Sequence, residues 1–112
     1  MTSNDELLIE TILEYCDDIS AALKRFSITE QVIRDDSDMK ALIAFFVLQI
    51  GETANKLSAN FRDEHPKIEW GAIIGFRNRI VHAYGEIIPA LLWDSVTDDV
   101  PKLRDYCADL LA

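Results

Sequence analysis

The sequence predicts an all-α fold, an antiparallel bundle of four main helices plus one short helix. Apolar residues recur at spacings of three and four along most of the chain, the period of a helix with one buried face. The chain contains no repeat, linker or low-complexity segment. Its 112 residues can form one hydrophobic core, and short connections between long helices favour antiparallel packing. We therefore expect one helical domain over residues 1–112.

The first helix is expected to run from about residue 4 to residue 25. Ser3 and Glu6 have the spacing of a capping box, in which side chains satisfy free N–H groups at a helix start. Its apolar stripe consists of Leu8, Ile12, Cys16, Ile19, Leu23 and Phe26. Residues 28–34 then predict the one short helix.

A third helix of about 23 residues follows Asp35-Asp36-Ser37, a helix-start signal. Its apolar stripe consists of Met39, Ile43, Phe46, Ile50, Ala54, Leu57 and Phe61. Ala41, Phe45 and Leu48 widen this stripe, so we expect the helix to contact its own bundle on one side and a second subunit on another. The His65-Pro66 loop ends it.

The fourth helix is expected from near Glu69 to Gly85, because glycine is common directly after a helix. The fifth helix follows Pro89. The apolar residues that keep one phase along it are Leu92, Val96, Val100, Leu103, Cys107 and Leu110. Since this phase continues across Pro101, we expect a kink there rather than a break.

The net charge of −9 is distributed unevenly along the chain. Residues 1–20 carry six acidic side chains and no basic one, and residues 86–112 carry six acidic and two basic ones. Residues 53–82 carry five basic against three acidic side chains. Because binding RNA requires Lys and Arg at the phosphates, the net charge argues against a polyanionic partner, but the middle segment allows a local basic surface, so charge alone does not decide. The acidic ends are equally suited to a basic protein partner.

Other sequence features argue against several classes of protein. Cys16 and Cys107 form no CxxC or zinc-ligand spacing and lie on apolar stripes, which is typical of packed, reduced thiols. His65 and His82 are 17 residues apart without supporting Cys or carboxylate spacing, so neither a metal nor a cofactor is predicted. Residues 1–20 lack the basic residues of a signal peptide, and no apolar run approaches the roughly 20 residues that span a bilayer. We therefore expect a cytoplasmic protein.

The segment Gly75-Phe-Arg-Asn-Arg-Ile-Val-His-Ala-Tyr-Gly-Glu86 carries the candidate functional residues. Arg77, Asn78, His82 and Tyr84 supply a cation, an amide, a titratable ring and a phenol within eight residues. An imidazole can move a proton to or from a ribose oxygen near neutral pH, and a guanidinium stabilises the charge that builds up on a phosphate. Metal-free RNA cleavage needs this pair, so we interpret the segment as an active site.

Arg77 is expected on the apolar face of the fourth helix, in line with Trp70 and Tyr84. Because a buried, unpaired guanidinium is strongly destabilising, we expect Glu52 in the third helix to pair with it. Arg77 and His82 are five residues apart, about 140° around an ideal helix. A flexible arginine, a distorted helix end or a second protomer must therefore bring them to one phosphate.

A second face of this helix carries Gly71, Gly75, Asn78 and His82. A glycine inside a helix costs about 1 kcal/mol relative to alanine, so the two glycines indicate a close approach by a symmetry-related helix or a nucleic-acid backbone. The alternative is a helix that starts only after Gly75. Asn78 is placed to hydrogen-bond one ring nitrogen of His82 and to leave the other free for proton transfer. Arg79, on a third face, offers a second cation.

Residues 77–84, Arg-Asn-Arg-Ile-Val-His-Ala-Tyr, resemble the R-x4-H-x-Y signature of the HepT toxins. These form a branch of the HEPN (higher eukaryotes and prokaryotes nucleotide-binding) superfamily of helical ribonucleases. Residues 50–57 resemble the G-E-x-A-x-x-L segment of this family, and Ile68-Glu69-Trp70 resembles its lead-in to the motif helix. The resemblance covers essentially the whole chain. It implies a HEPN-like homodimer in which the two motif helices face each other and Arg77 and His82 build a composite cleft.

The resemblance also implies a metal-independent endoribonuclease toxin. His82 would act as general base or acid while the ribose 2′-hydroxyl attacks the adjacent phosphate, and Arg77 would stabilise the phosphorane. The implied partner is a cognate, MntA-like minimal nucleotidyltransferase antitoxin that transfers AMP from ATP to Tyr84. The bulky, negative adenylate would then block the cleft two residues from His82.

Two alternatives to an enzyme follow from the same residues. In the first, the bundle is a non-catalytic subunit that binds a nucleotidyltransferase, and RNA stays intact. In the second, it is a dimeric scaffold in which Arg77 and Glu52 form a buried pair and His82 only caps the helix.

Overall fold

The computed structural model describes residues 1–112 and is helical throughout, without strands. Its long helices are α1 (Ser3–Arg25), α3 (Ser37–Asn55) and α5 (Trp70–Ala83). A fourth long element consists of α6 (Pro89–Asp94), a π-helical turn (Ser95–Asp99) and α7 (Val100–Leu111). The short helices α2 (Glu30–Asp35) and α4 (Ala59–Glu64) lie in the connections, and a 3₁₀ turn (Tyr84–Glu86) follows α5. The all-α prediction is confirmed, with two short helices instead of one.

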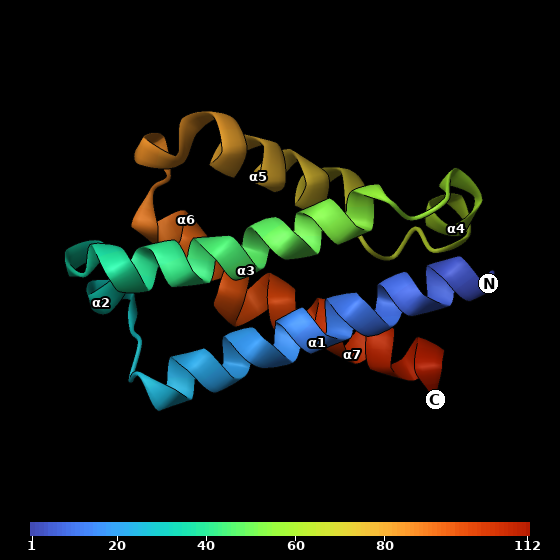
Figure 1. Ribbon diagram of the computed structural model, residues 1–112, viewed down its shortest axis with the longest axis horizontal. Helices are drawn as coiled ribbons and strands as arrows, with labels where there is room; N and C mark the ends of the chain where they lie inside the picture. Colours follow the sequence, from blue (N-terminus) through green and yellow to red (C-terminus); the bar gives the residue numbers. More distant parts are fainter.

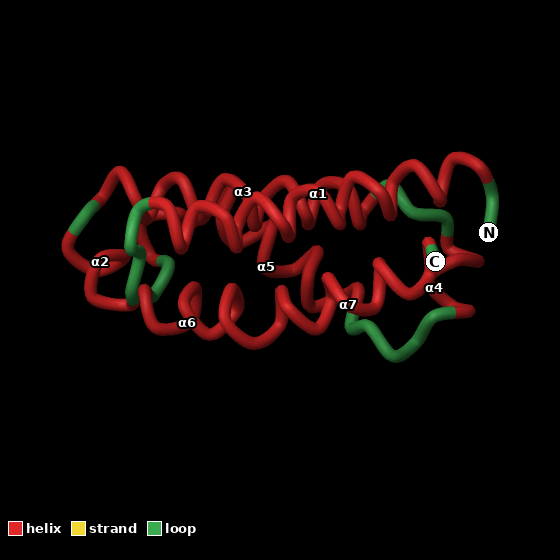
Figure 2. The backbone as a smooth tube through the Cα atoms, turned by 90° about the horizontal axis from the view of Figure 1, so that it is seen from below, coloured by secondary structure: helices red, strands yellow, loops and turns green.

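The long helices pack side by side in an elongated molecule of 42 × 28 × 19 Å. α3 packs against α1 and α5, and α1 packs against α7 (Figure 1). Seen from below, α1 and α3 form one layer, and the rod from α6 to α7 lies opposite them (Figure 2). One continuous core of buried apolar side chains joins the helices. It includes the free thiols Cys16 and Cys107, whose pKa burial raises to about 12, so the prediction of packed, reduced thiols is confirmed.

The start of α1 is set by a contact with a distant residue. Thr2, not Ser3, is the cap: its hydroxyl accepts a hydrogen bond from the N–H of Asp5 at 3.0 Å. The Asp5 side chain is only 2% exposed and accepts hydrogen bonds from the N–H (3.0 Å) and the hydroxyl (2.8 Å) of Ser58. The expected capping box of Ser3 and Glu6 is therefore wrong, because this tertiary contact decides the register of the first turn.

The third helix is shorter than predicted. It ends at Asn55, and the residues expected to form its last turn belong to the separate helix α4. Ser58 caps α4 by accepting a hydrogen bond from the N–H of Phe61 at 3.1 Å. Because Ser58 also donates its hydroxyl proton to Asp5, the chain interrupts the helix where both partners are satisfied. Leu57 and Phe61 are still buried, so the predicted apolar stripe persists although the helix does not.

The last predicted helix continues through Pro101, as its apolar phase indicates. The irregularity is a π turn directly before α7 rather than a simple kink. A π turn is one way in which a helix absorbs the hydrogen bond that proline cannot donate. None of the helices combines the length and the apolarity needed to cross a membrane.

α5 begins at Trp70 and contains both Gly71 and Gly75, so the alternative of a start after Gly75 is wrong. The helix ends at Ala83 instead of Gly85. No glycine in the chain has a positive φ, so Gly85 does not take the left-handed conformation expected of a capping glycine. Tyr84 therefore leaves the helix and begins the 3₁₀ turn.

Replacement of Asp5 by asparagine should destabilise the protein by about 1–3 kcal/mol, because an amide N–H would face the donors of Ser58. The hydrogen bond from the backbone N–H of Ser58 holds the pKa of Asp5 below its ordinary value. The stabilisation is therefore complete above the ordinary carboxyl pKa and is lost as pH falls through the folded-state pKa. Urea unfolding should show a lower midpoint for Asp5→Asn at neutral pH and a smaller difference in acid. Asp18→Asn, at an exposed position of α1, is the control, and equal midpoints for all three proteins would contradict this role.

Candidate functional site

Arg77 reaches from α5 to α3, where Glu52 pairs with it. Its Nε donates a hydrogen bond to Glu52 Oε1 at 2.7 Å, and Nη2 donates to the same oxygen. Nη1 donates to Asn78 Oδ1 at 2.7 Å. The side chains of Arg77 and Glu52 are 24% and 34% exposed. The predicted pairing is confirmed, and two of the five N–H groups of the guanidinium have no protein partner.

Gly51 allows α3 and α5 to approach closely at this point. A Cβ at position 51 would overlap with the Cβ of Arg77 and would lie 3.2 Å from the carbonyl oxygen of Ile73. Any larger residue would therefore have to push the helices apart. Because Glu52 follows Gly51 directly, its carboxylate lies beside Arg77 once the two helices are in contact.

The face of α5 that carries the two glycines is open to solvent. No group of the chain lies within 4 Å of the position that a Cβ would occupy on Gly71 or Gly75. Asn78 and His82 lie on the same face and are exposed. The expected hydrogen bond between Asn78 and His82 is wrong, since Asn78 accepts from Arg77 instead. A charged guanidinium held in place by Glu52 is the stronger donor.

Arg77 and His82 do not converge within one chain. α5 remains helical through His82 and ends at Ala83, so a distorted helix end does not close the gap between them. Arg77 is held on the α3 side by Glu52, whereas His82 is exposed on the glycine face. These contacts do not bring His82 to Arg77, and a second protomer at this site stays a prediction.

Arg79 and Tyr84 each contact another side chain of the protein. The guanidinium carbon of Arg79 lies 5.8 Å from the centre of the Phe76 ring, on the third face of α5 as predicted. Tyr84 is 37% exposed, and Lys40 Nζ lies 5.0 Å from the centre of its ring. Lys40 was not predicted as a site residue, because it is distant in sequence. The antiparallel packing of α3 and α5, which brings the start of one to the end of the other, is the signal that could have found it.

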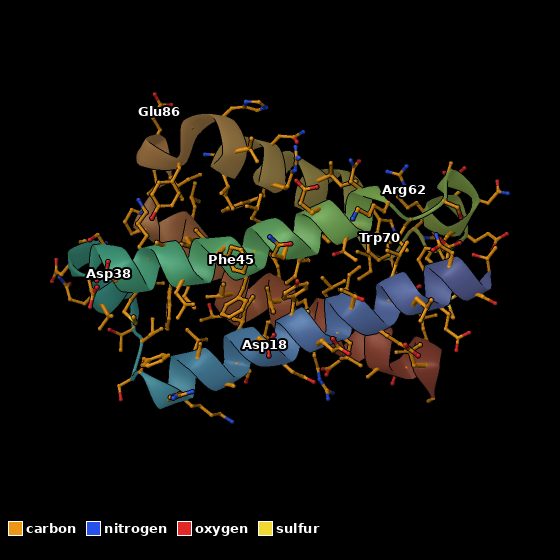
Figure 3. All side chains as sticks on the ribbon, in the orientation of Figure 1. Asp18, Asp38, Phe45, Arg62, Trp70 and Glu86 are labelled. Atoms are coloured by element: carbon orange, nitrogen blue, oxygen red, sulfur yellow. The ribbon has the colours of Figure 1, made fainter.

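Apolar side chains on α3 and α5 remain uncovered. Phe45 projects from α3 (Figure 3) and is 49% exposed. Val81 of α5 is 48% exposed. Ala41 is exposed as well, and Leu48 is partly buried. α3 therefore has the widened apolar face that the sequence indicates, and the contact of this face with a second subunit stays a prediction.

The structure offers no candidate metal centre. No group of three or more His, Cys, Asp or Glu side chains is placed to hold a metal ion. His65, the second histidine, stacks on Phe61 with 4.1 Å between ring centres, and its Nδ1 lies 2.8 Å from the carbonyl oxygen of the same residue. These contacts give it a structural role.

The protein is an all-helical bundle that carries Arg77 and His82 on α5 and Tyr84 in the turn that follows it. Residues 8–110 match the family model described as Ribonuclease HepT-like, and the chain belongs to this family. The family indicated by the sequence motifs is thus confirmed.

Individual relatives agree with this assignment. The chain is 26% identical over 103 residues to "Putative RNase TTE0752" of Caldanaerobacter subterraneus subsp. tengcongensis, a match that covers 92% of this chain and 90% of the relative. It is 27% identical over 96 residues to "Probable ribonuclease HepT" of Thermococcus cleftensis, covering 81% and 87%. A 55-residue segment, 49% of this chain and 50% of the relative, is 38% identical to "Putative RNase MJ1380" of Methanocaldococcus jannaschii. No solved structure matches the chain significantly.

Gly51→Ala should destabilise the protein by about 1–3 kcal/mol, because the new methyl group overlaps with Arg77 and forces α5 away from α3. Gly85→Ala is the matched control. Its methyl group meets nothing within 4 Å, and Gly85 has no positive φ that would require glycine. Chemical unfolding should therefore show a lower midpoint for Gly51→Ala and an unchanged one for Gly85→Ala. A Gly51→Ala protein as stable as the wild type would contradict the close helix contact.

Proposed function

We propose that this HepT-like ribonuclease is a metal-independent endoribonuclease toxin of a toxin–antitoxin pair, with Arg77 and His82 in a composite site at a homodimer interface. One observation carries the proposal. Glu52 and Asn78 hold the guanidinium of Arg77, and two of its N–H groups remain available to a phosphate. A donor that is fixed before the substrate arrives stabilises developing charge without reorganisation.

In the proposed reaction, His82 removes the proton from a ribose 2′-hydroxyl. The 2′ oxygen forms a bond to the adjacent phosphorus, and the bond from phosphorus to the 5′ oxygen of the next nucleotide breaks. The leaving 5′ oxygen takes a proton from an imidazolium, so the products are a 2′,3′-cyclic phosphate and a 5′-hydroxyl end. Arg77 donates hydrogen bonds to the phosphorane oxygens, whose negative charge grows in the transition state.

The open face of α5 supports the proposed dimer. Nothing in the chain contacts Gly71 or Gly75 at the positions where a side chain would be, and Phe45 and Val81 are about half exposed. A second copy related by a two-fold axis would cover such surfaces with the same surfaces of its own. This arrangement would bring His82 of each subunit toward the guanidinium of the other.

For regulation, we propose that a cognate MntA-like nucleotidyltransferase transfers AMP from ATP to the phenol oxygen of Tyr84 and releases pyrophosphate. Tyr84 is 37% exposed and follows His82 by two residues. Lys40, beside the tyrosine ring, would pair with the added phosphate. The adenylate would fill the cleft and repel the RNA backbone.

A second candidate function is a non-catalytic subunit that binds the nucleotidyltransferase. Two electrostatic features favour this alternative. The chain carries a net charge of −9, and Glu52 already neutralises Arg77. Both weaken the attraction for RNA. Under this alternative, RNA stays intact while the partner still binds or modifies the chain.

Purified wild-type protein should cleave total RNA in EDTA, and His82→Ala should be slower by about 10²–10⁴-fold, the usual contribution of a general acid or base. Gel electrophoresis of the fragments measures the rates, and circular dichroism checks that both proteins are folded. Arg34→Ala, which removes an exposed cation of α2, is the control and should retain activity. Equal cleavage by folded wild type and His82→Ala would overturn the role of His82, and intact RNA with the unmodified wild type would favour the binding subunit.

Subunit mixing separates a composite site from one confined to a single chain. Arg77→Gln and His82→Ala should each be inactive alone. A mixed dimer of the two still contains one intact Arg77 and one intact His82 on opposite subunits, so part of the activity should return. A mixture as inactive as its components would overturn the composite arrangement.

Incubation with the partner enzyme and ATP should add the mass of AMP to the wild type but not to Tyr84→Phe. Tyr84→Phe should also remain active and escape neutralisation, because the phenol oxygen is not needed for cleavage. Intact-mass spectrometry and the RNA assay measure both effects. Tyr106→Phe, in α7, is the matched control and should still be modified. A gain of one AMP by Tyr84→Phe would place the modification elsewhere.

A further inference from the structure

A cavity of about 400 Å³ lies between α5, α3 and the junction of the π turn with α7. Its apolar lining includes Ile50 of α3, Ile73 and Phe76 of α5, and Leu103 of α7. This volume is within the range of sites that bind small ligands. Neither Arg77 nor His82, the proposed catalytic pair, lines this cavity. The cavity is therefore distinct from the catalytic cleft.

Polar groups of both kinds also line this cavity. Lys67 and Lys102 can donate hydrogen bonds, Glu69 and Asp99 can accept them, and Ser95 can do both. The two positive and two negative charges balance, so the cavity does not favour an anion. A flat, neutral ring with donors and acceptors along one edge would fit a cavity whose lining is partly apolar and partly polar.

The π turn supplies two of these polar groups. Ser95 and Asp99 are its first and last residues, and both line the cavity. Such turns occur frequently at functional sites. Desolvation, followed by the neighbouring carboxylate of Asp98, raises the pKa of Asp99.

The cavity is connected to the proposed general base along one helix. Phe76 lines the cavity, and the guanidinium carbon of Arg79 lies 5.8 Å from the centre of its ring. His82 is three residues beyond Arg79, and residues three apart are neighbours on a helix surface. Arg79 does not itself line the cavity, but its contact with Phe76 places it beside a residue that does.

We propose that this cavity binds one nucleobase of the RNA next to the cleaved bond, with Ser95 and Asp99 hydrogen-bonded to the base edge and Arg79 at its phosphate. This proposal rests on the ribonuclease function proposed above. It assigns to the cavity the choice of base at the cleavage site. It also requires a single-stranded substrate, because a paired and stacked base cannot enter a side pocket.

Ala72→Phe tests the proposal by placing a larger side chain at the cavity. Ala72 is exposed and lines the cavity, so a larger side chain there does not enter the core. Ala21→Phe, the same change at an exposed position of α1, is the matched control. Each protein cleaves an RNA with a randomised segment, and sequencing of the new ends gives the base preference at every flanking position. Wild type and Ala21→Phe should prefer one base about tenfold or more at one position, and Ala72→Phe should lose this preference.

Asp99→Asn is a second variant that changes the polar lining without filling the cavity. It should alter which base is preferred while the protein still cleaves RNA, an effect that a purely structural role would not produce. Two outcomes would overturn the proposal: an unchanged preference in both folded variants, or wild-type cleavage without any base preference. The second outcome would leave the ribonuclease function intact, so the two failures are distinguishable.

A binding measurement tests the cavity even if the wild type cleaves no RNA. Fluorescence anisotropy compares labelled RNA tetranucleotides of A, G, C or U on wild type and Ala72→Phe. Tighter binding of one tetranucleotide, lost in Ala72→Phe, would support a base-binding cavity. Equal binding of all four would overturn it. Unlabelled AMP, GMP, CMP and UMP are also tested as competitors. If one of them competes as strongly as unlabelled RNA, the occupant is a free nucleotide and the assignment to RNA is overturned.

Discussion

The contact between α3 and α5 at Gly51 is the constraint on which the candidate site depends. Without a Cβ at this position, the two helices approach until the stem of Arg77 lies against the backbone of α3. Glu52 then pairs with the guanidinium, and Asn78 Oδ1 accepts a further hydrogen bond from Nη1 of the same group. A residue that would be a mobile surface cation becomes a fixed donor with two free N–H groups. Asn78 thus pairs with Arg77, and the hydrogen bond to His82 that the helix spacing suggested does not form.

The three faces of α5 have three separate roles. One face carries Arg77 and packs on α3, and burial there holds the helix to the bundle. A second face, with two glycines and His82, has no partner in the chain and is the surface assigned to a second subunit. The third face carries Phe76 and Arg79 and forms one wall of the cavity. In the proposed function, one helix would thus join a phosphate-binding group, a proton-transfer group and a wall of the base-binding cavity.

The charge distribution limits how such a protein can hold RNA. A net charge of −9 weakens the long-range attraction of a polyanion, so RNA binding depends on local groups of cations such as those in residues 53–82. Arg79 has a neutral ring as its neighbour, whereas Arg77 is neutralised by Glu52 and acts through directed hydrogen bonds. A cavity that binds a base through apolar contact would add affinity that does not depend on charge. In the proposed function, recognition of the base and stabilisation of the transition state are thus assigned to different groups.

The sequence by itself determined the features that depend on neighbours along the chain. Apolar periodicity predicted the all-α class, the long helices and the continuity of the last one through Pro101, and burial of a charge predicted the pairing of Arg77 with Glu52. It did not predict the inward Asp5, the helix break at Ser58, the partner of Asn78 or the approach of Lys40 to Tyr84. Each of these joins groups whose separation is decided by how helices pack, and a hydrogen bond depends on differences of less than an ångström. Only the tertiary structure sets such distances, because a helical pattern fixes the direction of a side chain but not what lies opposite it.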